Sequence, residues 1–218
     1  MSPFSVAFAS PFLVADFPLP QSMLSWSLTK PGFVRAKRVA WLQVRDADLP
    51  LGIDPARLLA SRMADAGHAD AVQLMTSRDL RWHHMDVAFS GTIAAACLAT
   101  VGLSNASRIG EMADHECVAG TINLLAHVDQ PLSQAALVEA LSIATEARTA
   151  AIIDLGLRRK GKVVTGTGTD CIVMAAPEGA APLHFAGLHT DVGMAIGRAV
   201  YDAVRRGGET WINNNRGS

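Results

Sequence analysis

Two long segments with helical periodicity, each with clear start and stop signals, constrain the fold of this chain more than any other feature. The first follows Ser133, a good N-cap, and ends at Gly156, and the second follows Thr190 and is predicted to end at Gly207. The first carries a row of small residues that would let another element approach closely: Ala136, Ala140, Ala144, Ala147 and Ala151. The apolar face of the second is Val192, Ile196, Ala199 and Ala203.

The segments around these helices predict strands and one shorter helix. The stretch 26–44 predicts two strands around a turn at Pro31–Gly32, and 54–67 predicts a helix with Asp54 as N-cap. A hairpin is predicted at 81–102, and single strands at 70–77, 120–130, 171–175 and 182–186. We therefore predict a single α+β (mixed α/β) domain over 1–206, in which two long helices pack on a mixed β-sheet, and a flexible tail over 207–218.

Composition narrows the class of protein. Half of the 218 residues are hydrophobic and 18% are charged, which is enough apolar material for a core, and the net charge of −1 argues against nucleic acid or an anionic membrane as partner. Three cysteines without a C-x-x-C pair favour a reducing, cytoplasmic setting. The apolar N-terminus lacks the basic start of a signal peptide, and the uncharged run 87–107 is better explained by a buried hairpin than by a membrane span.

Polar clusters interrupt these apolar segments at 102–110, 120–123, 144–149, 165–170 and 187–193. Asp170, directly before a strand, either accepts backbone donors or acts as a general base. Glu146 lies on a polar helical stripe that is either a solvated face or part of a site, and His189, before a helix N-cap, either bonds the backbone or transfers a proton. Neither a zinc-protease motif nor a phosphate-binding loop occurs, so neither a metal site nor an NTPase is predicted.

Four blocks, taken in order, resemble the adenosylcobinamide amidohydrolase family of corrinoid salvage over roughly residues 72–206: "TVGLSNASRIG", "GTINLLAHVDQPLSQAALVEALSIATEARTAAIIDLG", "TGTGTDCIVMA" and "AGLHTDVGMAIGRAVYDAV". The resemblance implies hydrolysis of the amide that joins aminopropanol to the corrin ring, with adenosylcobyric acid as product. It also implies that the corrinoid is the substrate and that the protein needs no cofactor of its own. A homo-oligomer is possible.

Amide cleavage needs an activated water or nucleophile, donors for the oxyanion and an acid for the leaving amine. Asp170 or Glu146 is predicted to activate water and His189 to protonate the amine, with Asp170 and His189 expected in one pocket. The predicted substrate contacts are Ser104, Asn105, Asn123, Thr145, Thr167, Gly168, Thr169 and Thr190. Two other hypotheses stay open: a non-catalytic corrinoid carrier, and a self-processed amidase with a threonine or serine nucleophile, for which Thr165, Thr167 and Thr169 are candidates.

Overall fold

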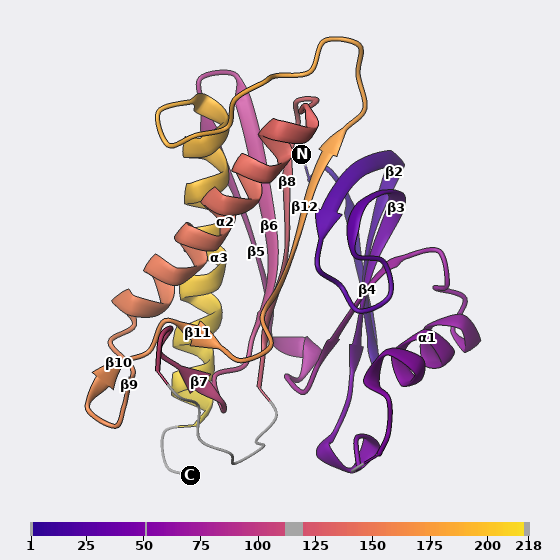
Figure 1. The fold of residues 1–218 in the computed structure, drawn as a ribbon, viewed down its shortest axis with the longest axis vertical. Coiled ribbons are helices and arrows are strands. Elements are labelled where there is room, and N and C mark those ends of the chain that lie inside the picture. The colour runs from indigo at the N-terminus through magenta and orange to yellow at the C-terminus, as the bar shows by residue number, and fades with distance from the viewer. Residues whose placement is uncertain (1, 51, 112–119, 216–218) are drawn as a thin grey trace.

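One curved, mixed β-sheet and three helices form the fold (Figure 1). The computed structural model describes residues 2–50, 52–111 and 120–215. The strands of the large sheet are β1 (Ser5–Ala9), β2 (Phe12–Ser25), β3 (Gly32–Gln43), β4 (Val72–Thr76), β5 (His83–Ser90), β6 (Ile93–Val101), β8 (Ile122–Val128) and β12 (Cys171–Pro177). The helices are α1 (Pro55–Asp65), α2 (Gln134–Asp154) and α3 (Asp191–Asn214). Four two-residue strands, β7 (Ala106–Ser107), β9 (Arg158–Arg159), β10 (Lys162–Val163) and β11 (Gly166–Thr167), and two short 3-10 turns complete the described elements.

The strand order in the sheet is β4-β3-β2-β12-β8-β6-β5, with β1 paired to β2. The pairs β3–β4 and β8–β12 are parallel and the others are antiparallel, which confirms the predicted mixed sheet. The predicted hairpin is also confirmed, because β5 and β6 pair from His83↔Thr100 to Ser90↔Ile93.

The sheet bends sharply at β2, which belongs to both of its halves. The register between β2 and β3 jumps between Asp16 and Gln21, a segment that contains Pro18 and Pro20. Proline has no N–H to donate to a strand ladder, so this segment is where regular pairing is interrupted. The two halves of the sheet then pack face to face around a buried core that includes Trp41, Leu74, Leu98, Leu125 and Val173.

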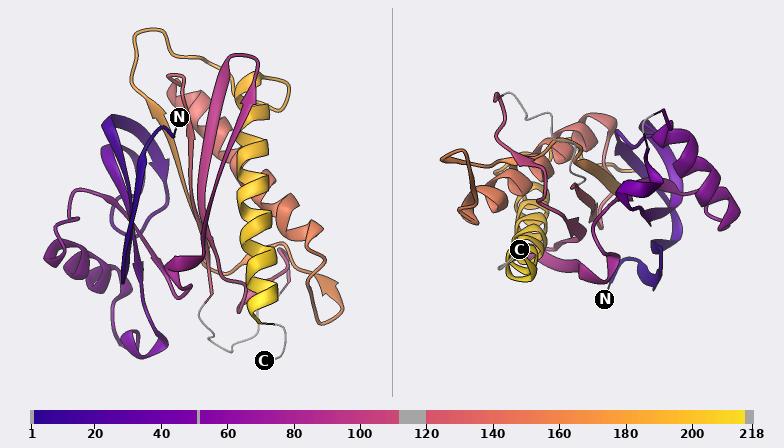
Figure 2. Two further views of the ribbon diagram at one scale, coloured as in Figure 1. Left: turned by 180° about the vertical axis from the view of Figure 1, so that it is seen from behind. Right: turned by 90° about the horizontal axis from the view of Figure 1, so that it is seen from below.

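The helices cover the two outer faces of the bent sheet (Figures 1 and 2). Helices α2 and α3 contact each other and pack on β5, β6, β8 and β12, while α1 covers β3 and β4 on the other side. The predicted caps are confirmed: the hydroxyl of Ser133 accepts the N–H of Ala136, that of Thr190 accepts the N–H of Gly193, and Asp54 caps α1. None of the described helices is long and apolar enough to cross a membrane.

Three sequence predictions about the fold are wrong. Helix α3 does not end at Gly207 but continues to Asn214, so the described part of the predicted tail is largely helical. Gly207 and Gly208 are buried because the helix passes close to Val101 and Leu155, where a Cβ at either glycine would clash. The predicted strand at 182–186 is a loop with a single bridge between Leu183 and Leu132. The strand predicted from residue 26 to the turn at Pro31–Gly32 is also a loop, because the strand that pairs with β3 is β2, which ends at Ser25.

Candidate active site

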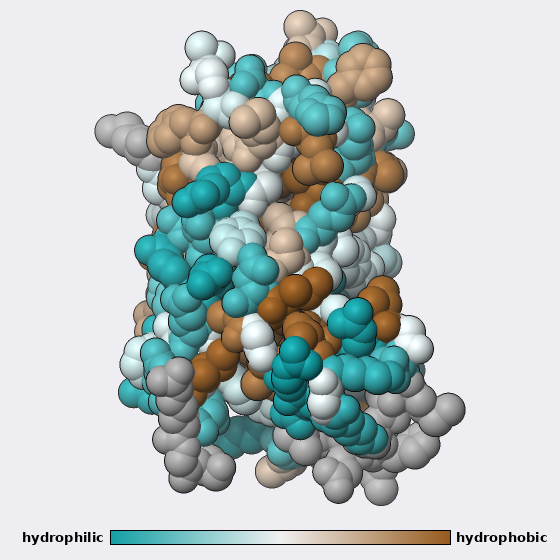
Figure 3. Space-filling model, turned by 90° about the vertical axis from the view of Figure 1, so that its left-hand side faces the viewer, coloured by the Kyte–Doolittle hydropathy of each residue, from teal (hydrophilic) through white to brown (hydrophobic). Residues whose placement is uncertain are grey.

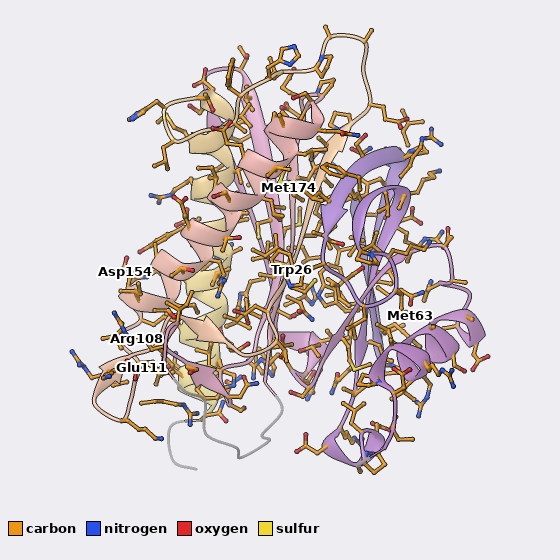
Figure 4. All side chains as sticks on the ribbon, viewed as in Figure 1. Trp26, Met63, Arg108, Glu111, Asp154 and Met174 are labelled. Carbon is orange, nitrogen blue, oxygen red and sulfur yellow. The ribbon has the colours of Figure 1, made fainter. Side chains whose placement is uncertain are left out.

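Polar side chains from three loops meet at one end of the sheet, drawn at the bottom of Figure 1, where β6 ends and β8 and β12 begin. Pairing of β7 with β11, with Thr167 opposite Ala106, joins the loop after β6 to the loop before β12. The structure thereby brings together most of the predicted site residues: Ser104, Asn105, Asn123, Thr167, Gly168, Thr169 and Asp170. Arg108 and Glu111, labelled in Figure 4, lie at the same end, where Arg108 donates to the carbonyl of Val163.

The carboxylate of Asp170 is a buried structural acceptor. It lies 2.5 Å from Nη1 of Arg148 and accepts the N–H groups of Ile122 and Thr167, each at 3.0 Å, together with the hydroxyl of Thr167. The two charged side chains are 8% and 12% exposed. Four donors occupy the roughly four lone-pair positions of a carboxylate. These contacts match the alternative in which Asp170 accepts backbone donors and holds the loop to α2 and β8.

The peptide bond between Gly120 and Thr121 is held on both sides by Thr169. The hydroxyl of Thr121 donates to the carbonyl of Thr169 at 2.7 Å, and the hydroxyl of Thr169 donates to the carbonyl of Gly120 at 3.1 Å. The N–H of Gly102 donates to the carbonyl of Thr121 at 2.9 Å. Thr121 is 4% exposed and was not among the predicted site residues. The alternation of side chains along a strand could have found it, because residues 121 and 123 share one face.

Gly120 fills a niche with polar walls. A Cβ on this residue would lie 2.8 Å from Oδ1 of Asn105, 2.9 Å from the backbone nitrogen of Asn105 and 3.0 Å from that of Ser104, so only glycine fits here. Oδ1 of Asn105 is buried and has no hydrogen-bond partner among the residues that the structure describes. A buried polar atom without a partner is a candidate for binding a ligand.

Asn123 has a different environment from Asn105. It is 1% exposed, and its Nδ2 donates to the carbonyl of Met75 at 2.7 Å, which connects β8 to β4 across the interface between the two halves of the sheet. Its Oδ1 lies 3.4 Å from the hydroxyl of Thr121. Asn123 therefore both supports the packing of the sheet halves and borders Thr121.

His189 and Thr190 lie at the opposite end of the molecule from Asp170. Asp170 directly precedes β12, whereas His189 follows the loop that leaves the far end of β12 and is exposed beside the start of α3 (Figure 1). Seven residues of strand span about 20 Å at roughly 3.3 Å per residue. The expectation that Asp170 and His189 meet in one pocket is therefore wrong. Strand order, which the sequence patterns did not reveal, separates them.

Thr145 and Glu146 also lie outside this cluster, on α2. Glu146 is exposed and accepts the hydroxyl of Ser142 at 3.3 Å, while the hydroxyl of Thr145 donates to the carbonyl of Leu141 one turn earlier. The interpretation of Glu146 as part of a solvated face matches these contacts. Figure 3 shows the side of the molecule on which α2 and α3 lie, where polar residues are interspersed with apolar ones.

Three further residues border the cluster and were not singled out from the sequence. Arg148 anchors Asp170, and the indole N–H of Trp26, labelled in Figure 4, donates to the backbone carbonyl of Asp170 at 2.7 Å. Burial lowers the pKa of Arg78, whose Nε and Nη2 have no hydrogen-bond partner in the described part of the chain. Gly102 lies between Arg78 and Thr121, since a Cβ there would be 3.5 Å from Cβ of Arg78 and from the nitrogen of Thr121.

The donor set of this cluster suits a neutral carbonyl group. The hydroxyl of Thr169 and the backbone nitrogens of Ser104 and Asn105 lie beside Gly120, and the hydroxyl of Thr121 follows it. Such donors stabilise the oxygen of a tetrahedral intermediate when they are held rigidly away from water. Within residues 2–50, 52–111 and 120–215, no three His, Cys, Asp or Glu side chains group as a set of metal ligands.

Fold and site define a mixed α/β protein whose candidate site lies at one end of two packed sheet halves. The sequence model of the adenosylcobinamide amidohydrolase family matches residues 3–216, and the chain belongs to this family. An adenosylcobinamide amidohydrolase of Halobacterium salinarum is 33% identical over 157 residues, which cover 67% of this chain. The chain spans 64% of the length of that curated relative.

Two solved structures superpose on this chain with TM-scores below 0.5 and at low sequence identity. A Pyrococcus horikoshii protein superposes with a TM-score of 0.48 at 10% identity, covering 95% of this chain and 79% of the other. The L-aminopeptidase D-Ala-esterase/amidase of Ochrobactrum anthropi, described as a variant of the Ntn-hydrolase fold, superposes with a TM-score of 0.40 at 12% identity, covering 94% and 82%.

Proposed function

We propose that this protein hydrolyses the amide that joins the aminopropanol arm to the corrin ring of adenosylcobinamide, releasing adenosylcobyric acid and aminopropanol for corrinoid salvage. The observation that carries the proposal is the family match over residues 3–216. The name of the Halobacterium salinarum relative supports the same reaction.

The cluster at the start of β8 supplies the groups that this chemistry requires. The backbone nitrogens of Ser104 and Asn105 and the hydroxyl of Thr169 lie beside the niche of Gly120, where their hydrogens could hold a substrate carbonyl, and Oδ1 of Asn105 adds one acceptor. We assign Asp170 a positioning role, because its lone pairs are occupied by the loop and by Arg148. His189 lies at the other end of β12, and Glu146 is exposed on α2 with Ser142 as its hydrogen-bond partner, so we assign neither of them the acid or base of the proposed reaction.

The reaction is proposed to need no cofactor of the protein's own, since the corrinoid is the substrate, and to take place in the cytoplasm. The odd number of cysteines supports a reducing compartment, and the described ones, Cys97 and Cys171, are buried and free. Burial raises the pKa of Cys171 to about 12, so its thiol stays protonated and does not compete as a nucleophile.

Incubation of the purified protein with adenosylcobinamide, followed by chromatography and mass spectrometry of the corrinoid, tests the proposal. We expect adenosylcobyric acid and free aminopropanol in equal amounts, with the same rate after treatment with a chelator. A folded protein that binds adenosylcobinamide in equilibrium dialysis and leaves its amide intact would instead be a corrinoid carrier. A rate that falls with chelation and returns with added metal would contradict the metal-independent reaction.

A further inference from the structure

The Gly120–Thr121 peptide bond combines features that a simple strand start does not need. Thr169 bonds the carbonyl on one side of this bond and the hydroxyl on the other, and Asn105 lines the niche of Gly120 with a buried oxygen that has no partner among the described residues. We propose that the chain cleaves itself at Gly120–Thr121, and that Thr121, with its freed α-amino group, is the nucleophile of amide hydrolysis. The nucleophilic role of Thr121 rests on the proposed function, whereas self-cleavage does not.

In turnover of a substrate amide the hydroxyl of Thr121 needs a base, because a threonine hydroxyl is a weak nucleophile at its ordinary pKa. The hydroxyl of Thr121 contacts the carbonyl of Thr169 and Oδ1 of Asn123, and neither is a base. In the described part of the chain, no carboxylate or imidazole bonds this hydroxyl. An α-amino group on Thr121 itself would supply the base at a fixed distance, with an ordinary pKa of about 7.7–8.0.

The contacts around the peptide bond favour an internal acyl shift. Oγ1 of Thr121 would attack the carbonyl carbon of Gly120 as the C–N bond breaks, and the hydroxyl proton would pass to the nitrogen of Thr121. Water would then hydrolyse the resulting ester, leaving a carboxylate on Gly120 and restoring the hydroxyl. The Thr169 hydroxyl, 3.1 Å from the carbonyl oxygen of Gly120, is placed to stabilise the negative charge that develops on that oxygen.

Cleavage would also open the site to substrate. In the uncleaved chain Thr121 is 4% exposed and Gly120 fills the polar niche beside Asn105 and Ser104. Departure of the new carboxyl end would leave this niche for the acyl group of the substrate amide. Oγ1 of Thr121 would then form an ester with the acyl carbon as the amide C–N bond breaks, and the α-amino group would pass the hydroxyl proton to the leaving amine. Water would release the acid and return a proton to Oγ1.

This places the nucleophile at a residue that the sequence hypothesis of self-processing did not include. Its candidates were Thr165, Thr167 and Thr169. The hydroxyl of Thr165 accepts the N–H of Ile109 and that of Thr167 donates to Asp170, so both serve the structure of the loop. Thr169 is exposed and supports the bond to be cleaved.

Mass spectrometry of the purified protein under denaturing conditions, without substrate, tests the cleavage. We expect two fragments, residues 1–120 and 121–218, in place of the chain of 23.0 kDa. Thr121→Ala and Thr121→Val should stay intact and lose at least a hundredfold in turnover of adenosylcobinamide, whereas Thr121→Ser should still cleave and keep measurable turnover. Thr210→Val, which removes a hydroxyl that donates to the carbonyl of Arg206 one turn earlier in α3, is the matched control and should cleave as wild type does.

The outcomes separate this inference from the proposed function. An intact wild-type chain overturns self-cleavage, whether or not it turns over adenosylcobinamide. Fragment masses that place the cleavage at a peptide bond other than Gly120–Thr121 overturn the inference as well. Cleavage at Gly120–Thr121 without turnover would leave the processing established and contradict the corrinoid reaction. Thermal melting of Thr121→Val measures whether the variant is folded. A folded Thr121→Val variant with wild-type turnover would remove Thr121 from the chemistry.

Discussion

Replacement of Asp170 by asparagine separates a structural role of this residue from a chemical one. The substitution keeps the size of the side chain and removes its charge, which leaves the guanidinium of Arg148, 12% exposed, without its counter-ion. Breaking a buried ion pair by removing one partner costs about 3–5 kcal/mol. The amide also offers one acceptor oxygen where the carboxylate offers two, so the donors Ile122 and Thr167 cannot both keep their present acceptor atoms.

We therefore expect Asp170→Asn to lower the free energy of unfolding by about 3–5 kcal/mol. At roughly 2–4 °C per kcal/mol for a chain of this size, the melting temperature should fall by about 6–20 °C. Urea denaturation and thermal melting measure both quantities. The exposed pair Arg198–Asp202 provides a matched control, since Asp202→Asn removes a similar contact at the surface and should cost at most about 1 kcal/mol.

A double-mutant cycle with Arg148→Met shows whether the two charges act together. Methionine fills a similar volume without a charge, so the double variant should be more stable than the sum of the two single losses predicts. The reasoning would be refuted by an Asp170→Asn variant that melts within about one degree of wild type and still loses a hundredfold or more in kcat. A loss of that kind, with stability preserved, is what removal of a general base produces.

Three further predictions follow from the same contacts. Asn105→Ala should lower kcat/KM by roughly tenfold, about the worth of one hydrogen bond to the substrate, with little change in melting temperature, because Oδ1 of Asn105 lines the niche and has no partner among the described residues. Asn123→Ala removes the bond to Met75 and should also lower the free energy of unfolding by about 1–3 kcal/mol. Equal melting temperatures for the two variants would contradict this distinction. Burial lowers the pKa of His127 from 6.5 to about 4, so the unfolded chain binds a proton that the folded chain does not, and stability should fall by up to about 3 kcal/mol as the pH drops from 6.5 to 4. Urea titrations at several pH values measure this, and a His127→Gln variant with the same pH dependence would refute it. His189→Ala, at the far end of β12, should keep turnover within about twofold, and a hundredfold loss would show that this end of the molecule takes part in the reaction.

Elements were predictable from the sequence wherever their signals are local. Ser133 and Thr190 cap their helices through N–H groups three residues further along the chain, and hydrophobic spacing within each segment decides which face is buried. The end of α3 was missed for the converse reason. Gly207 and Gly208 look like a stop signal, but they are needed for close contact with Val101 and Leu155, which belong to other elements.

The sequence by itself determined the fold class, the helix starts, the hairpin, the polar loops and, through four ordered blocks, the family. Only the tertiary structure decided which loops share a site. Thr121 and Thr169 are 48 positions apart, and their contact exists because β8 and β12 are parallel neighbours that begin at the same end of the sheet. The same strand arrangement places His189 at the other end. Local signals act over three or four residues, whereas the pairing of distant strands depends on how the whole chain buries its apolar surface.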